Sequence, residues 1–138
     1  MAAAGLGPQV EHGGTVYQFS VLDGIGYALY QAWLERQAVR AVRAQRDYLP
    51  DAEYRVERAE VNRDIAAQVY AFGSERFTQS LRSLPGLKEV CRLALQKRHP
   101  GADDELVDAL FRADQAGMIR VGLAVLGASV PDADGGGA

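Results

Sequence analysis

The stretch Gln9–Phe19, which reads QVEHGGTVYQF, has the alternating pattern of β-strands, and this pattern does not recur in the rest of the chain. Two short runs of β-forming residues flank Gly13-Gly14, and glycine reaches the positive φ angles of two-residue hairpin turns without strain. The stretch therefore predicts a β-hairpin in which Val10 lies opposite Tyr17 and His12 lies opposite Thr15. A lone hairpin is marginal in water. We therefore expect one face to be buried, made of Val10, Tyr17, Phe19 and Val21.

The pattern changes at Asp23, and from there most of the chain has the spacing and punctuation of helices. Residues whose side chains accept hydrogen bonds from backbone N–H groups, such as Asp23, Ser74 and Asp103, lie where helices are expected to begin. Proline and glycine lie between the predicted helices. The predicted helices run from about 23 to 46, from 51 to 72, over a short segment after 74, from about 87 to 99, from 103 to about 111, and from about 115 to 126. We therefore predict a mainly α fold, in which an N-terminal β-hairpin precedes a compact bundle of five to six helices.

The chain of 138 residues has the length of one domain with its own core. We assign residues 9–127 to that domain, residues 1–8 to a flexible N-terminus and residues 128–138 to a disordered Gly-rich tail. The first residues lack the basic and apolar regions of a signal peptide. The longest apolar stretch, Met118–Gly127, contains Arg120 and is too short to span a bilayer. These features predict a soluble, cytoplasmic protein without a membrane partner.

No group of residues has the spacing of a catalytic, cofactor or metal site. Gly24-Ile25-Gly26 lacks the third glycine of a dinucleotide fingerprint and follows a hairpin strand, so we expect these glycines to permit close packing. His12 and His99 have no ligand partners at metal-binding spacing. Asp103-Asp104-Glu105 is explained by helix capping, and the single cysteine, Cys91, is expected in the core. We therefore predict a protein that is not an enzyme and has no cofactor and no metal.

Arg36, Arg40 and Arg43 recur at helical spacing and form a basic row, the best candidate for contact with nucleic acid. The formal net charge of −3 opposes this reading. Acidic residues at 53, 57 and 60 are available to pair with the row. A helix-turn-helix within residues 85–111 would begin its second helix with three acidic residues, the wrong charge for a phosphate-facing end. We therefore expect a solvated or salt-bridged face and no nucleic acid partner.

The chain also has more large apolar residues than a small core requires, which indicates surfaces for a protein partner. Three features provide these apolar residues: the edge of the hairpin, the helix that is apolar on nearly all sides, and a tryptophan on a charged helix. The alternative is that these side chains fill one core. The predicted partner-binding residues are Tyr17, Phe19, Trp33, Met118, Ile119 and Leu123.

The order of these parts resembles a known family. The run Gly14–Phe19 leads into a long Arg-rich helix; later come the segment Leu84–Pro100, which reads LPGLKEVCRLALQKRHP, and the acidic helix start at Asp103. This order resembles the small tail assembly chaperones of long-tailed phages and phage-like particles. Residues 97–100 match best, whereas residues 47–83 match only as generic helix.

The resemblance implies a non-catalytic helical protein in the cytoplasm of the host cell. It implies a tape-measure protein as partner, whose long hydrophobic helices are kept soluble until tail tube proteins assemble around them. The unpaired edge of the hairpin would bind the tail tube protein or a second copy of the chain. A homo-oligomer is therefore one of the alternatives. The alternative is a structural or connector protein of a phage or phage-like particle, which would be found in the purified particle.

Overall fold

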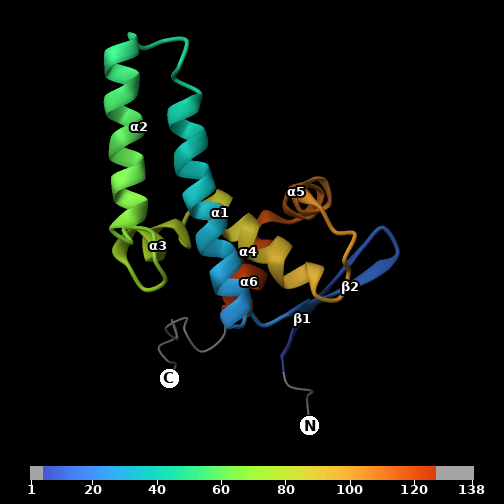
Figure 1. Ribbon diagram of the computed structural model, residues 1–138. Helices are drawn as coiled ribbons and strands as arrows, with labels where there is room; N and C mark the ends of the chain where they lie inside the picture. Colours follow the sequence, from blue (N-terminus) through green and yellow to red (C-terminus); the bar gives the residue numbers. More distant parts are fainter. Residues whose placement is uncertain (1–4, 127–138) are drawn as a thin grey trace.

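The computed structural model describes residues 5–126 as a β-hairpin followed by helices, which confirms the predicted fold class (Figure 1). The expected tail at 128–138 lies outside the described residues. Within them, no helix is long and apolar enough to cross a bilayer. The elements are β1 (Leu6–His12), β2 (Thr15–Ser20), α1 (Gly24–Arg43), α2 (Asp51–Ala66), α3 (Glu75–Ser80), α4 (Leu84–Gln96), α5 (Asp104–Ala113) and α6 (Gln115–Val125).

The hairpin forms with the predicted register. Val10 pairs with Tyr17, His12 pairs with Thr15, and both turn glycines have positive φ angles, 58° at Gly13 and 82° at Gly14. The strand β1 begins at Leu6, so residues 6–8 belong to the hairpin and the predicted flexible terminus reached too far along the chain. The predicted inner face is buried at Phe19 and half-buried at its other positions.

Short side chains cap the helices at their first turns, because they satisfy backbone N–H groups that have no partner within the helix. Asp23 accepts from the N–H of Gly26, Ser74 from that of Phe77, and Asp103 from that of Leu106. Helix α4 begins at Leu84, one position after its cap Ser83, and so includes the proline expected in the break.

Helix α2 ends earlier than predicted. It stops at Ala66 instead of Phe72, and the chain then turns through Gln68, which has a φ of 63°. The side chain of Gln31 in α1 accepts from the N–H of Phe72 at 3.0 Å, so a tertiary contact takes the place of another helical turn. The side chain of Phe72 is 61% exposed.

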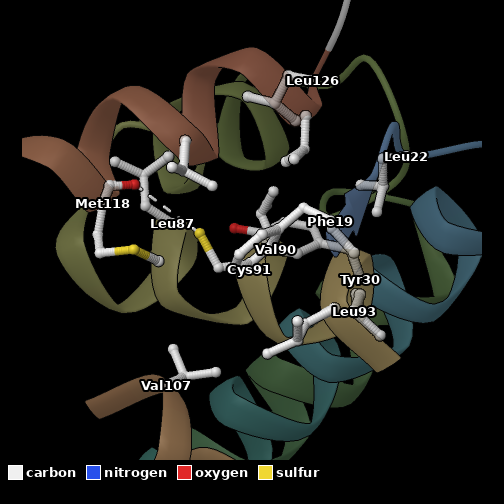
Figure 2. Packing of buried hydrophobic residues seen from close by; sticks show 14 of the residues in the cluster. Phe19, Leu22, Tyr30, Leu87, Val90, Cys91, Leu93, Val107, Met118 and Leu126 are labelled. Carbon is white, nitrogen blue, oxygen red and sulfur yellow. Dashed lines mark hydrogen bonds between the residues drawn. The ribbon is translucent and has the colours of Figure 1, made fainter. Parts of the chain in front are cut away.

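Helix α4 is the centre of the core, and α1, α5, α6 and β2 all pack against it. Figure 2 shows Leu87, Val90 and Cys91 of α4 meeting Phe19 from the hairpin and Met118 from α6. Cys91 is fully buried, as predicted, and burial raises the pKa of its thiol to about 12. Helix α6 was expected to be central or covered by a partner; four of its residues are buried within this chain: Met118, Val121, Gly122 and Val125.

Helix α2 and the second half of α1 form an antiparallel pair that extends away from the other elements (Figure 1). We call residues 35–66 the arm. The hairpin, the first half of α1 and helices α4–α6 together make up the body. The arm is held by Val42 of α1, which is 7% exposed, and by half-buried residues of α2 such as Val61 and Ile65. No residue of α2 is buried, so the arm exposes most of its surface.

Candidate partner-binding surface

Helix α1 has one face that neither the body nor α2 covers. Residues 25, 29, 36, 40 and 43 recur at spacings of three, four and seven, which places them on one side of a helix. Ile25 is 72% exposed and Leu29 is 51% exposed. The opposite side of α1 carries Tyr30, which is fully buried. The exposed side is apolar near the start of the helix and basic near its end.

The apolar end of this face borders a groove between α1 and α4, which we call the apolar groove. It encloses about 220 Å³. Exposed apolar residues that adjoin one another in a groove indicate an interaction site, whereas single scattered ones do not. Its lining includes Leu22, Ile25, Leu29, Leu93, Ala94 and Lys97.

Two charged side chains form an ion pair at the rim of the apolar groove. Asp23 caps α1 and forms an ion pair with Lys97, just beyond the end of α4, which ties the two helices together. The hydrogen bond from Lys97, together with that from the N–H of Gly26, lowers the pKa of the Asp23 carboxyl. The residues that line the groove come from α1, from α4 and from the short segments next to their ends.

The basic end of the face is the basic row of Arg36, Arg40 and Arg43, which borders a hollow of about 500 Å³. Among residues 5–126, no carboxylate lies within ion-pairing distance of these guanidinium groups. The salt bridges considered for Glu53, Glu57 and Glu60 are therefore not formed. The remaining lining residues are Ala32, Glu35, Val39 and, from α2, Ile65.

Together, the apolar groove and the basic row form a strip along α1. From Ile25 to Arg43 the helix rises about 27 Å, at about 1.5 Å per residue. A strip of this length and chemistry suits a partner helix that has apolar residues at one end and carboxylates at the other. Within the described residues, no three His, Cys, Asp or Glu side chains are grouped so that they could hold a metal ion.

Two of the predicted partner-binding residues belong to the core, which corrects that prediction. Phe19 is fully buried and Met118 is 2% exposed. The alternation of β2 turns Phe19 toward α4, and Met118 lies beside Cys91, whose thiol donates to the Met118 carbonyl at 3.9 Å (Figure 2). Neither side chain can reach a partner without unfolding part of the body.

The other four predicted residues lie in three different elements. Tyr17 is half-buried with its ring centroid 5.3 Å from that of His99, and Trp33 is half-buried at 5.3 Å from Tyr30. Ile119 is also half-buried, whereas Leu123 is 40% exposed. Trp33 lines a hollow shared with α4 and α5, while Met118 lines another hollow beside the hairpin, so the six residues do not make one surface.

The most exposed apolar residues of α1, Ile25 and Leu29, were missed by the sequence prediction. Ile25 was considered only as part of a glycine motif, and Leu29 was not among the predicted partner-binding residues. The signal was present, because Ile25 and Leu29 fall on the same helical face as Arg36, away from Tyr27, Tyr30 and Leu34.

Comparison of the chain with protein-family models, with curated proteins and with solved structures finds no match. Function therefore has to be inferred from the chemistry of the exposed surfaces.

Proposed function

We propose that the protein is a non-catalytic tail assembly chaperone that binds helices of a phage tape-measure protein and so assists assembly of the tail tube. The observation that supports this proposal is the strip along α1, where exposed Ile25 and Leu29 lead into the unpaired basic row. A chaperone for long amphipathic helices needs apolar surface presented on a scaffold that stays folded without its client. The sequence resemblance to tail assembly chaperones supports the same role.

The binding mode follows from the chemistry of the strip. The apolar side chains of a client helix would lie over the apolar groove, and client carboxylates would lie over the basic row. Burial of apolar surface supplies most of the affinity in such contacts, at about 25 cal/mol per Å² before the costs of association. The arginines fix the direction in which the client lies and raise the association rate.

Co-expression with the tape-measure protein, followed by affinity capture and size-exclusion chromatography, tests the proposal. We expect the client to be soluble and captured with the parent chain, and to precipitate with the variant Ile25→Ser/Leu29→Ser. The matched control is Leu123→Ser, which removes another exposed leucine, on α6. If Leu123→Ser fails to capture the client and Ile25→Ser/Leu29→Ser still captures it, the client-binding site lies on α6 and not on α1.

The runner-up role, a structural or connector protein of the particle, gives a different result. A chaperone leaves the finished particle, whereas a structural protein stays in it. If mass spectrometry of purified particles finds the chain in stoichiometric amounts, and the chain does not solubilise the tape-measure protein, the chaperone proposal is wrong.

A further inference from the structure

The arm carries a second row of like charge that the proposed function does not use. Glu53, Glu57, Glu60 and Asp64 recur at spacings of four, three and four in α2, which places their carboxylates on one face of the helix; we call them the acidic row. The first three are exposed and Asp64 is half-buried. In the described part of the chain, no Lys, Arg or His side chain lies within ion-pairing distance of these carboxylates.

Rows of like charge weaken the helices that carry them. Like-charge pairs at a spacing of four destabilise an isolated helix. The arm has two such rows, the basic row on α1 and the acidic row on α2. Mutual neutralisation within one arm would remove the cost, yet the two rows form no ion pair with each other.

The two rows border different hollows. The basic row borders the hollow whose lining residue from α2 is Ile65. Two members of the acidic row, Glu53 and Glu57, border another hollow, near the tip of the arm. The two hollows have no lining residue in common.

The two hollows also complement each other in their apolar parts. Beside the arginines lie Ala32, Val39 and Ile65. Beside the glutamates lie Leu49, Ala52 and Val56, and the side chain of Val56 is 56% exposed. The first hollow has three arginines and Glu35 in its lining, so its net charge is positive, whereas the two charged residues of the second are glutamates. Each surface therefore combines small apolar side chains with a net charge, and the sign of that charge is opposite on the two surfaces.

We propose that the protein associates with itself through the arm, with the acidic row of one copy lying against the basic row of the next. A second copy supplies the missing charges for both rows and covers the apolar side chains beside them. Because the two surfaces are separate, each copy can contact one neighbour through each, so the assembly is head-to-tail and closes into a ring or continues as a chain.

This self-association goes beyond the proposed function and does not depend on the identity of the client. It has a consequence for client binding, because the basic row is part of the strip along α1. A neighbouring α2 and a client helix would compete for the same arginines. The acidic helix of the second copy then protects the strip until a client with similar chemistry displaces it.

Sedimentation velocity of the purified full chain, without any client, tests the proposal. In about 0.05 M salt we expect species heavier than the 14.9 kDa monomer, and in about 1 M salt we expect the monomer, because the screening length falls to about 3 Å. A monomer at low salt over the whole accessible concentration range would overturn the proposal.

Charge inversion makes the test specific. The variant Arg36→Glu/Arg40→Glu/Arg43→Glu and the variant Glu53→Lys/Glu57→Lys/Glu60→Lys should each be monomeric at low salt. An equal mixture of the two should associate again, because each variant then offers the charge that the other lacks. Folded variants, as judged by circular dichroism, that fail to associate when mixed would contradict the head-to-tail contact.

Two further variants complete the test. The control Arg82→Glu/Arg112→Glu/Arg120→Glu makes the same change of charge at exposed positions outside the arm, and it should associate like the parent chain. If a triple inversion unfolds the arm, the milder Arg36→Gln/Arg40→Gln/Arg43→Gln should weaken association by about threefold or more, since it removes three exposed ion pairs. Association that is unchanged in this variant would exclude the basic row.

Discussion

The arm and the body are built from helices of similar length, yet they use their side chains in opposite ways. In the body, α4 has 13 residues and eight of them are buried: Gly86, Leu87, Glu89, Val90, Cys91, Leu93, Ala94 and Leu95. In the arm, α2 has 16 residues and none is buried. The apolar pattern of α4 specifies the fold, whereas the sorted charges of α2 contribute little to it. Charges that are sorted but do not stabilise the fold are better explained by an intermolecular contact.

A matched pair of leucines tests this difference with the largest expected effect. Leu95 of α4 is fully buried, and Leu29, on the open face of α1, is 51% exposed. We expect Leu95→Ala to lower the free energy of unfolding by about 2–5 kcal/mol, since it removes buried methyl groups and leaves a cavity. Leu29→Ala should change it by less than about 1 kcal/mol. Urea denaturation followed by circular dichroism measures both.

The same pair separates stability from binding. Leu29→Ala should weaken capture of the client although the protein stays folded, whereas the folded fraction of Leu95→Ala should still bind. Equal loss of stability in the two variants would mean that the open face of α1 is part of the core, and the proposed partner surface would be wrong.

A pair of glycines gives the next largest effect. A Cβ at Gly86 of α4 would lie 1.9 Å from the backbone oxygen of Ser80 and 2.6 Å from the Tyr30 hydroxyl, whereas a Cβ at Gly24 of α1 would meet nothing within 4 Å. We expect Gly86→Ala to destabilise the protein by about 1–3 kcal/mol through overpacking. Gly24→Ala should stabilise it by up to about 1 kcal/mol, because alanine loses less conformational entropy on folding. Thermal unfolding should move in opposite directions for the two variants.

The elements that were predicted correctly from the sequence depend on local chemistry. The hairpin register follows from Gly13-Gly14, and the beginnings of α1, α3 and α5 follow from the cap residues Asp23, Ser74 and Asp103. A two-residue turn and a capping side chain each act within about four residues, so a single sequence contains all the information that they need.

The features that were missed depend on contacts between distant residues. Beyond the end of α2, the N–H of Phe72 donates to the side chain of Gln31, 41 positions away in the sequence. The choice between core and partner surface was also not local. Phe19 and Leu123 are both large and apolar, but Phe19 is buried where the hairpin packs on α4, whereas Leu123 on α6 is 40% exposed.

Alkaline pH should act on the body through its buried ionisable groups. Burial raises the pKa of Cys91 from 9.0 to about 12 and that of Tyr30 from 10.0 to about 12. Between these values the unfolded chain has lost a proton that the folded chain keeps, so stability falls as the pH rises. Each group contributes a slope of up to about 1.4 kcal/mol per pH unit, beginning near pH 9 for Cys91 and near pH 10 for Tyr30.

The variant Cys91→Ala isolates the thiol. Its free energy of unfolding should depend less steeply on pH between 9 and 10 than that of the parent chain, whatever the cost of the small cavity at neutral pH. Urea titrations at these pH values measure the slope. A slope that is the same in both proteins would show that the thiol of Cys91 ionises in the folded body, and that the core around α4 is open to water.

The smallest effect concerns whether the arm opens separately from the body. Ala59 is exposed in α2, and Ala109 lies half-buried in α5. Glycine costs about 1 kcal/mol relative to alanine in a helix. If the arm opens locally, Ala59→Gly should speed hydrogen exchange about fivefold at the amides of α2 and leave those of α4 unchanged. Ala109→Gly should instead speed exchange at the slowest amides of the whole body.

Faster exchange of α4 amides in Ala59→Gly would mean that arm and body unfold as one unit. The charged rows would then be held by the same cooperative structure as the core, and self-association would raise the stability of the whole protein. With separate opening, self-association should slow exchange at the arm alone, since a contact can protect only the part of the structure that must open to break it. Hydrogen exchange at low and high salt therefore distinguishes two cases. Either the arm opens separately and is ordered by contact with other copies of the chain, or the arm is rigid before it binds them.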